Sequence, residues 1–378
     1  MDCPSSSSVS DPAVEIPNIP EELIIEILSR LPVKPLLRFR CVSKSWNSLI
    51  SSPSLIKTHR TKCSKNHDYT HHRLIFHTFE KCQNDRLKFN LKLCPLHAAI
   101  YQHDDDAPAT QVTIMGDDFL VNSLGNNHDF NREIVMADFD DGYDHKVFLL
   151  GSCNGLLCVY VFGDIFLWNP SIRKSKKLPD FGPKSGTAAA MLYGFGYDES
   201  NDDYKVYRIL GSNQTWVDAY SQNTNSGRRI EDFNGVLINQ GVYFVSGKLH
   251  WSVGGTGGKI VTLDLTDGMY GEVEQPKYGE HHVGWNLEVL GGCLAVFYYH
   301  QNGHVDLWIM QEYGVKESWT KMVLMINYPY SSFQMFQKPV FLLKDGEILF
   351  QFGDGLVLYH PKRKSCTYPR IANVKALL

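Results

Sequence analysis

The chain has 378 residues, a formal net charge of -4 at pH 7, and 43% hydrophobic residues. This length exceeds what one ordinary core supports, so it predicts two domains, or one repeat-built domain with an appendage. No uncharged apolar run is long enough to span a bilayer, which argues against membrane insertion. Residues 1–14 lack the features of a signal peptide and are predicted to form a flexible tail. We therefore expect a cytoplasmic or nuclear protein, or one found in both.

The sequence predicts neither a metal site nor a cofactor. None of the nine cysteines forms a Cys-x-x-Cys pair, and buried free thiols are the expected state. His71-His72 and His281-His282 are adjacent pairs. Neighbouring residues on a strand point to opposite faces, so neither pair is suited to chelation.

The charge is distributed unevenly along the chain. Nine of the 37 Lys and Arg residues lie between Arg30 and Lys65, a segment without Asp or Glu. Basic residues interleaved with Trp46 and Phe39 are also typical of nucleic-acid surfaces. Against that, large aliphatic residues occupy positions where a groove-reading helix needs polar side chains. Nucleic acid is therefore not expected to bind.

Three short helices are predicted in this basic segment and just before it. The first begins at Pro20, which is followed by two glutamates that favour the positive end of the helix dipole. Pro32 ends this helix, and a second is expected over Leu36 to Val42. Ser43 is suited to cap a third helix, which Pro53 ends. The segment is therefore a small helical module.

The three helices carry more apolar surface than they can bury among themselves. The first has an apolar arc of roughly 200° at about 100° per residue. Each fully buried Leu or Ile contributes roughly 1.5 to 3 kcal/mol, so the excess surface needs cover. Either a partner protein or the rest of the chain provides it, and periodicity alone leaves both open.

Ile19 to Leu55, IPEELIIEILSRLPVKPLLRFRCVSKSWNSLISSPSL, resembles an F-box of the form found in large plant families. The resemblance implies a three-helix module, at residues 15–60, that docks on the acidic Skp-type adaptor of a cullin–RING ubiquitin ligase. By the same resemblance, some of the matching residues contact the adaptor and others form the module's own core. These residues are Pro20, Leu23, Ile27, Leu28, Leu31, Pro32, Leu36, Leu37, Val42, Trp46, Leu49 and Ile50.

After a polar linker at residues 61–69, the pattern becomes that of an all-β domain at residues 70–378. Short apolar stretches alternate with turns rich in Gly, Asn, Asp and Ser. The acidic stretches at residues 104–106 and 137–144 are interpreted as solvated loops, and Ser212 to Asn234 as a further loop. The predicted strands are Arg73 to Phe79, Leu87 to Leu93, Val147 to Phe162, Tyr204 to Leu210 and Val242 to Val253.

A weak repeat runs through this domain. Each unit has a turn glycine, an apolar strand, a loop and a second strand; the glycines are Gly155, Gly247, Gly292 and Gly346. Two of the spacings are close to the length of a four-stranded propeller blade, and the longer first spacing leaves room for an additional unit. The fold class predicted is therefore α+β multidomain, with a small helical module followed by an all-β propeller-like domain.

The segments GSCNGLLCVYVFGDIFLWNPSIRKSKKLP, YGFGYDESNDDYKVYRIL and VSGKLHW resemble the plant F-box-associated domain of type 1. The resemblance implies a propeller-like domain that holds the protein to be degraded. With the F-box, it implies the substrate receptor of an SCF-type ubiquitin ligase, which is not itself an enzyme. Its partners would be the Skp-type adaptor, cullin and RING subunits through it, and an unknown target.

Two alternatives stay open. In the first, the chain is a propeller-fold binding protein or enzyme whose N-terminal helices serve only its own fold. In the second, it is an F-box protein that acts without ubiquitination. Asp198, Glu199, Asp202 and Asp203 could supply a glycosidase-type acid and base, but their polar turn more often indicates exposed charge. The tryptophans that recur in the repeats, Trp168, Trp251, Trp308 and Trp319, are interpreted as core residues.

Overall fold

The computed structural model describes two compact units, residues 1–66 and 67–378. The residues described are 19–66, 71–81, 87–101, 147–161, 163–180, 190–211, 215–230, 241–254, 258–277, 282–300, 305–324, 338–352 and 355–369, with residues 69, 113, 114, 233, 235 and 237. The predicted tail at residues 1–14 and the acidic loops at 104–106 and 137–144 lie outside them.

The first unit is helical. Its first three helices are α1 (Glu21–Leu28), α2 (Val33–Phe39) and α3 (Lys44–Ile50), as many as predicted. The second begins and ends three residues earlier than the predicted span of Leu36 to Val42, because it starts directly after Pro32. The hydroxyl of Ser43 caps α3 by accepting the backbone N–H of Trp46 at 3.1 Å. The prolines also act as expected, because Pro32 lies at the boundary between α1 and α2 and Pro53 follows α3.

A fourth helix, α4 (Pro53–Ser64), was not predicted. Ser52 caps it by accepting the backbone N–H of Leu55 at 3.3 Å, and Pro53 occupies its first turn. Ser-Pro is a recognised start signal, since the cap satisfies a free N–H group and proline lacks one. Residues 61–64, which the sequence analysis assigns to the start of a linker, are helical. The reason is that Pro53 not only follows α3 but also begins α4.

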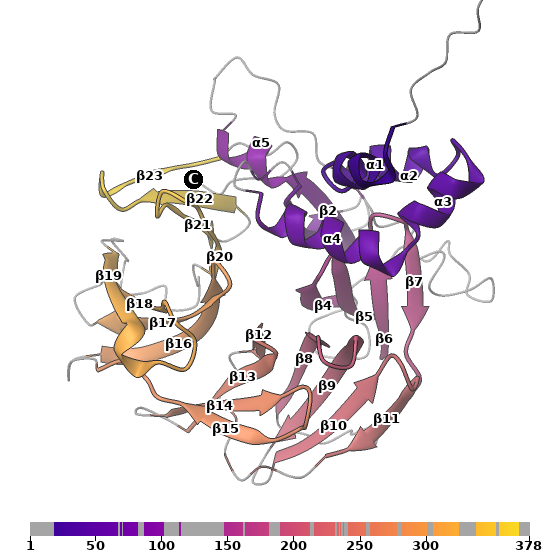
Figure 1. The fold of residues 1–378 in the computed structure, drawn as a ribbon. Helices are drawn as coiled ribbons and strands as arrows, with labels where there is room; N and C mark the ends of the chain where they lie inside the picture. The colour runs from indigo at the N-terminus through magenta and orange to yellow at the C-terminus, as the bar shows by residue number, and fades with distance from the viewer. Residues whose placement is uncertain are drawn as a thin grey trace, which may run out of the picture. The chain divides into compact units, whose positions relative to one another are not determined.

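The described residues of the second unit form five four-stranded antiparallel sheets, each a simple meander, and so confirm the propeller-like domain (Figure 1). The first two blades are β4 (Val147–Cys153), β5 (Leu156–Val161), β6 (Asp164–Asn169) and β7 (Lys174–Lys177), then β8 (Ala190–Asp198), β9 (Asp203–Gly211), β10 (Thr215–Ser221) and β11 (Ser226–Arg229).

Three further blades complete the series. They are β12 (Tyr243–Val245), β13 (Lys248–Val253), β14 (Lys259–Asp264) and β15 (Tyr270–Val273); β16 (His282–Leu290), β17 (Cys293–His300), β18 (Val305–Met310) and β19 (Trp319–Leu324); and β20 (Lys338–Leu342), β21 (Ile348–Phe352), β22 (Gly355–His360) and β23 (Ser365–Thr367). A 3-10 helix, η2 (Lys316–Ser318), lies between β18 and β19.

A smaller sheet and one helix precede the blades in the chain. The sheet consists of β1 (Arg73–Lys81), β2 (Leu87–Pro95) and β3 (Thr113–Ile114), and the helix is α5 (Leu96–Tyr101). Leu96 and Ile100 pack in one cluster with Leu349 and Leu358 of the last blade. The N-terminal strands of the domain are thereby joined to its C-terminal blade.

The first strand of each blade lies on the inside of the propeller. β4 contacts β8, β8 contacts β12, β12 contacts β16 and β16 contacts β20, whereas the fourth strands β7 and β11 are largely exposed. Buried side chains fill the junctions between blades; Cys158 of the first blade, for example, packs with Phe195 of the second. The hydrophobic core is thus divided among the junctions, and each blade depends on its neighbours.

The predicted turn glycines all lie in the left-handed region of φ. Gly155, Gly247, Gly292 and Gly346 have φ of 79°, 77°, 82° and 81°. Three of them end two-residue hairpins in which both turn residues have positive φ, a geometry that matches the twist of the strands. The additional unit expected between Gly155 and Gly247 is the blade β8 to β11, whose first turn ends in Asp202 rather than glycine.

Replacing Gly247 with alanine should lower the stability of the propeller by about 1 kcal/mol, because only glycine adopts this backbone region freely. An added Cβ would meet nothing within 4 Å, so the cost is backbone strain alone. Differential scanning calorimetry should show a Tm lower by roughly 2 to 4 °C. Gly284→Ala is the control, because its Cβ also meets open space without a positive φ; equal shifts would contradict the strain argument.

Some predicted strands were too long, and other strands were not predicted. Val147 to Phe162 and Val242 to Val253 are each a hairpin of two strands rather than one strand. The interpretation of Ser212 to Asn234 as a loop was wrong, because it contains β10 and β11. β11 has the sequence SGRR and is exposed along its length, so it carries no apolar alternation that would have revealed it.

Candidate functional site

The helical unit has a small core of its own. Leu28, Leu36, Ile50 and Leu55 are buried together, and Trp46 is among the partly buried side chains that pack against them. Leu55 comes from the unpredicted α4, which therefore completes the core that α1 to α3 begin. A module this small would be marginal on three helices alone.

Burial divides the twelve residues that the F-box resemblance selected. Three belong to the core, namely Leu28, Leu36 and Ile50. Four are half-buried, namely Leu31, Leu37, Trp46 and Leu49. Five are exposed, namely Pro20, Leu23, Ile27, Pro32 and Val42. The exposed and half-buried residues are the ones available to a partner, and their contact with an adaptor stays a prediction.

Two apolar surfaces remain uncovered on the helical unit. On α1, Leu23 and Ile27 are each 54% exposed and lie one turn apart. At the end of α2, Val42 is 59% exposed, and Phe39 packs edge-on against Trp46 with ring centroids 5.6 Å apart. Large aliphatic side chains left in water around a completed core are typical of an interaction surface.

Helix α4 is joined to α1 by polar contacts. The carboxylate of Glu26 accepts hydrogen bonds from Arg30, at 2.7 Å, and from Lys62. These two donors lower the pKa of Glu26. Lys62 also donates to the hydroxyl of Ser29 at 2.9 Å, and a ring nitrogen of His59 lies 2.8 Å from the carbonyl oxygen of Leu31. Together, these hydrogen bonds orient α1 relative to α4.

The remaining cations of the unit are available to an acidic surface. Lys34, Arg38, Lys44 and Lys57 are exposed and make no ion pair with another described residue. Charges of one sign around an apolar surface speed association with a partner of the opposite sign and orient it. The unit therefore combines apolar contact area with a positive surround.

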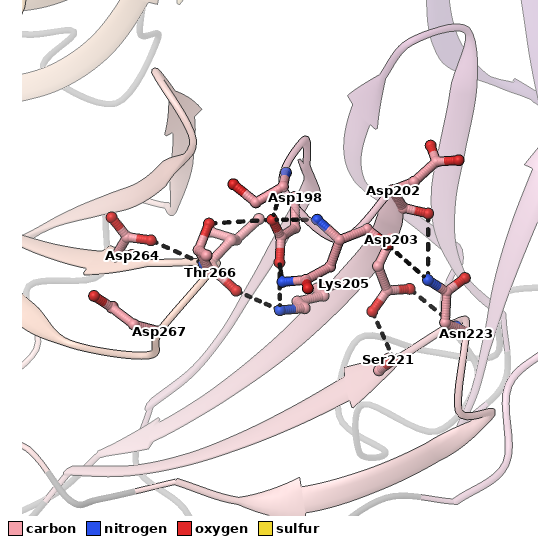
Figure 2. A network of polar contacts seen from close by, with 12 residues as sticks. Asp198, Asp202, Asp203, Lys205, Ser221, Asn223, Asp264, Thr266 and Asp267 are labelled. Atoms are coloured by element: carbon pink, nitrogen blue, oxygen red, sulfur yellow. Dashed lines mark hydrogen bonds and ion pairs between the residues drawn. The ribbon is translucent and has the colours of Figure 1, made fainter.

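In the propeller, the acidic turn after β8 is a structural network rather than an exposed loop (Figure 2). Asp198 is only 1% exposed, and its carboxylate accepts hydrogen bonds from Asn201 at 2.7 Å, Lys205 at 2.8 Å and the Thr266 hydroxyl at 3.1 Å. Lys205 also donates to the carbonyl oxygen of Leu265. Since Thr266 and Leu265 follow β14, the network joins the second blade to the third.

The same turn is fixed from its other end. Asp203 is 4% exposed, and it accepts hydrogen bonds from the Ser221 hydroxyl at 2.6 Å and from the backbone N–H of Asn223 at 2.9 Å. Asn223 returns a hydrogen bond to the carbonyl oxygen of Asn201 at 3.0 Å. The expectation of exposed charge was therefore wrong for Asp198 and Asp203, because hydrogen-bond donors satisfy both carboxylates inside the domain.

This geometry does not suit acid–base chemistry. Burial alone would raise the pKa of Asp198, but the hydrogen bonds from Asn201, Lys205 and Thr266 outweigh it and lower the pKa to about 2. A carboxyl that stays ionised to this pH cannot serve as a general acid near neutrality. The network joins two blades and leaves Asp198 without the raised pKa that a general acid needs.

The tryptophans predicted to lie in the core do so with one partial exception. Trp168, Trp251 and Trp319 are buried. Trp308 is half-buried, and the Lys321 ammonium lies 5.8 Å from the centre of its ring. Nothing in this arrangement presents a series of open rings on which a sugar would stack.

A buried histidine joins the third and fourth blades. His250 on β13 is fully buried, and its Nδ1 lies 3.2 Å from the carbonyl oxygen of Tyr243, so Nδ1–H must be the donor. Its Nε2 then accepts from the hydroxyl of Tyr313 at 2.8 Å. Burial lowers the pKa of His250 to about 4, although backbone hydrogen bonds with Tyr243 and Lys248 oppose this.

We expect stability to fall between pH 6.5 and pH 4 because of His250. The unfolded chain binds a proton near pH 6.5, whereas the folded chain binds it only near pH 4. Stability is therefore fully present above the unfolded pKa and decreases by up to about 3 kcal/mol as the pH falls through this interval. Urea unfolding at several pH values measures the slope.

His250→Gln is the matched variant for this prediction, because glutamine also donates and accepts hydrogen bonds but does not titrate. Its unfolding free energy should vary less between pH 6.5 and pH 4 than that of the unaltered protein. An identical pH slope in the two proteins would show that another group controls the effect.

The described part of the chain contains no candidate metal site and no candidate membrane-spanning helix. No three His, Cys, Asp or Glu side chains there are placed to hold a metal ion. None of its helices is long and apolar enough to cross a membrane.

Comparison with known proteins identifies the family. The family model for the F-box domain matches residues 16–58, and the model for the F-box associated beta propeller domain matches residues 111–376. The chain belongs to the plant F-box proteins with an F-box-associated domain. The propeller match establishes this family without specifying type 1, the subtype that the sequence resembles.

Relatives share both parts of this F-box protein. An F-box/kelch-repeat protein of Arabidopsis thaliana is 29% identical, with 93% of this chain and 90% of that protein covered. The F-box protein CPR1 of the same organism is 29% identical, with 86% of this chain and 78% of that protein covered. The similarity therefore extends over the F-box and the propeller together.

Proposed function

We propose that this F-box protein is the substrate-receptor subunit of an SCF-type, cullin–RING ubiquitin ligase. The F-box would bind the Skp-type adaptor and, through it, the cullin and RING subunits, and the propeller would hold a target protein for ubiquitination and degradation. As such a receptor it would act in the cytoplasm, the nucleus or both. The observation that carries the proposal is the exposed apolar pair Leu23 and Ile27 on an F-box whose own core is already complete.

The proposed role needs no catalytic group in the chain. Holding a target beside the ubiquitin-charged enzyme raises the effective concentration of its lysines and orients them. The satisfied carboxylates of Asp198 and Asp203 agree with such a positional role, since they support the fold of the propeller. The chain is then a specificity subunit and not an enzyme.

A reconstituted ubiquitin-transfer assay tests the proposal. Proteins stabilised in cells by a version lacking residues 1–66 supply candidate targets, because that version would bind targets without the ligase. We expect at least one candidate to receive ubiquitin when the intact chain is added with adaptor, cullin and RING subunits, and not when it is omitted. Adaptor binding without any transfer would instead support an F-box protein that acts without ubiquitination.

A further inference from the structure

The outer strands of the first two blades concentrate positive charge. β7 contains three exposed lysines and β11 contains two exposed arginines, and neither strand contains an acid, although Lys177 of β7 pairs with Asp164 of β6 at 2.5 Å. The other three outer strands differ: β15 carries Glu272, β19 carries Lys321 paired with Asp306, and β23 is uncharged. Lysines often protect an exposed strand edge from aggregation, but that need would apply to all five blades alike.

Two of these cations lie over aromatic rings of a single strand. Trp216, Asp218 and Tyr220 alternate along β10 and so share one face. The Arg229 guanidinium lies 5.3 Å from the centre of the Trp216 ring, and the Lys176 ammonium lies 5.9 Å from that of Tyr220. Because Lys176 belongs to the first blade and Tyr220 to the second, the two blades meet along this face.

We call the surface formed by Lys174, Lys176, Trp216, Asp218 and Arg229 the basic seam. Lys174 and Lys176 are two residues apart on β7 and share a face. Asp218 is buried and pairs with Arg208 at 3.1 Å and with Arg229 at 3.2 Å. Asp218 pairs with these two arginines, and Lys174 and Lys176 add two exposed cations, so the seam keeps an excess of positive charge on a chain whose net charge is -4.

The seam also offers the residue types that dominate protein interfaces. Trp216 is 40% exposed beside Arg229, and Trp and Arg are enriched among residues that contribute most to binding. β7 is the last strand in the order β4-β5-β6-β7 of the described sheet, so its outer backbone groups are positioned to pair with an added strand. A nucleic acid could use the cations but not this backbone edge.

We propose that the basic seam binds an extended, acidic segment of the target protein that carries an apolar anchor residue. Carboxylates of the segment pair with Lys174, Lys176 and Arg229, its anchor packs on Trp216, and its backbone lies along β7. The proposal rests on the proposed function, because it names the chemistry by which the propeller selects its target.

Selection of peptides from a random display library on the intact chain tests this proposal. We expect the enriched peptides to be acidic with one or two large apolar residues. The double variant K174E/K176E should weaken their binding about ten-fold or more, which corresponds to about 1.4 kcal/mol. The matched control, K362E/R363E, makes the same charge change at exposed residues before β23 and should leave binding unchanged. Trp216→Ala is a second variant that should also weaken binding and changes no charge.

Three outcomes would overturn the proposal. The first is that no peptides are enriched, or that the enriched peptides are neutral or basic. The second is an equal loss of peptide binding in K174E/K176E and K362E/R363E, and the third is that K174E/K176E loses single-stranded RNA binding but keeps peptide binding. Adaptor capture is measured on the same preparations and should not change in either variant. A chain that binds acidic peptides at the seam but not the adaptor would contradict the ligase function alone.

Discussion

Replacing Ile27 with aspartate should weaken capture of the Skp-type adaptor by roughly a hundred-fold or more, about 3 kcal/mol, while the protein stays folded. Ile27 is 54% exposed on α1, so a charge there meets water in the free chain. In the complex the same charge would be buried without a partner, which is costly. Co-purification and titration by isothermal calorimetry measure the loss.

One control variant makes this result specific. Met269→Asp places the same charge on an exposed apolar residue of the propeller and should leave adaptor capture unchanged. Leu28→Asp would not serve as the test, because Leu28 is 1% exposed inside the F-box core and its replacement would unfold the module. Full capture by Ile27→Asp would show that α1 does not face the adaptor.

Replacing Asp198 with alanine should lower the unfolding free energy of the propeller by about 3 to 5 kcal/mol, because it leaves the partly buried Lys205 without its counter-charge. The change also removes the acceptor for Asn201 and Thr266, and so weakens the link between the second and third blades. Chemical denaturation of the full chain measures the loss.

The neighbouring Glu199 provides a control in the same turn. Glu199 is exposed, so Glu199→Ala should change the unfolding free energy by less than about 0.5 kcal/mol. Asp198→Asn should be intermediate, since an amide still accepts hydrogen bonds but carries no charge. If Asp198→Ala were no more destabilising than Glu199→Ala, the network would not be what holds these blades together.

The sequence predicted the structure most reliably at residue types that have a single structural role. Glycine in a hairpin turn is such a case, and Gly155, Gly247, Gly292 and Gly346 marked four blades correctly because their φ is positive. Proline is another, since Pro32 lies at the boundary between α1 and α2 as expected. The repeat spacing left room for an additional unit between Gly155 and Gly247, and a blade lies there, although its first turn ends in Asp202.

The sequence failed where local pattern does not determine burial. On α1, Leu28 and Ile27 are adjacent aliphatic residues, and only the packing of α2, α3 and α4 decides that the first is buried and the second exposed. Asp198 lies in a stretch of acidic residues, yet partners that follow β14, far along the chain, bury it. The basic seam was likewise not visible, because Lys176 and Tyr220 belong to different blades.

The central claim is that this F-box protein binds a Skp-type adaptor through its helical unit. Size-exclusion chromatography with light scattering, at near-physiological salt, tests it most directly. We expect the intact chain and the adaptor to elute together as a one-to-one complex, and a chain lacking residues 1–66 to elute apart from the adaptor. Separate elution of the intact chain and the adaptor, with both folded, would contradict the claim.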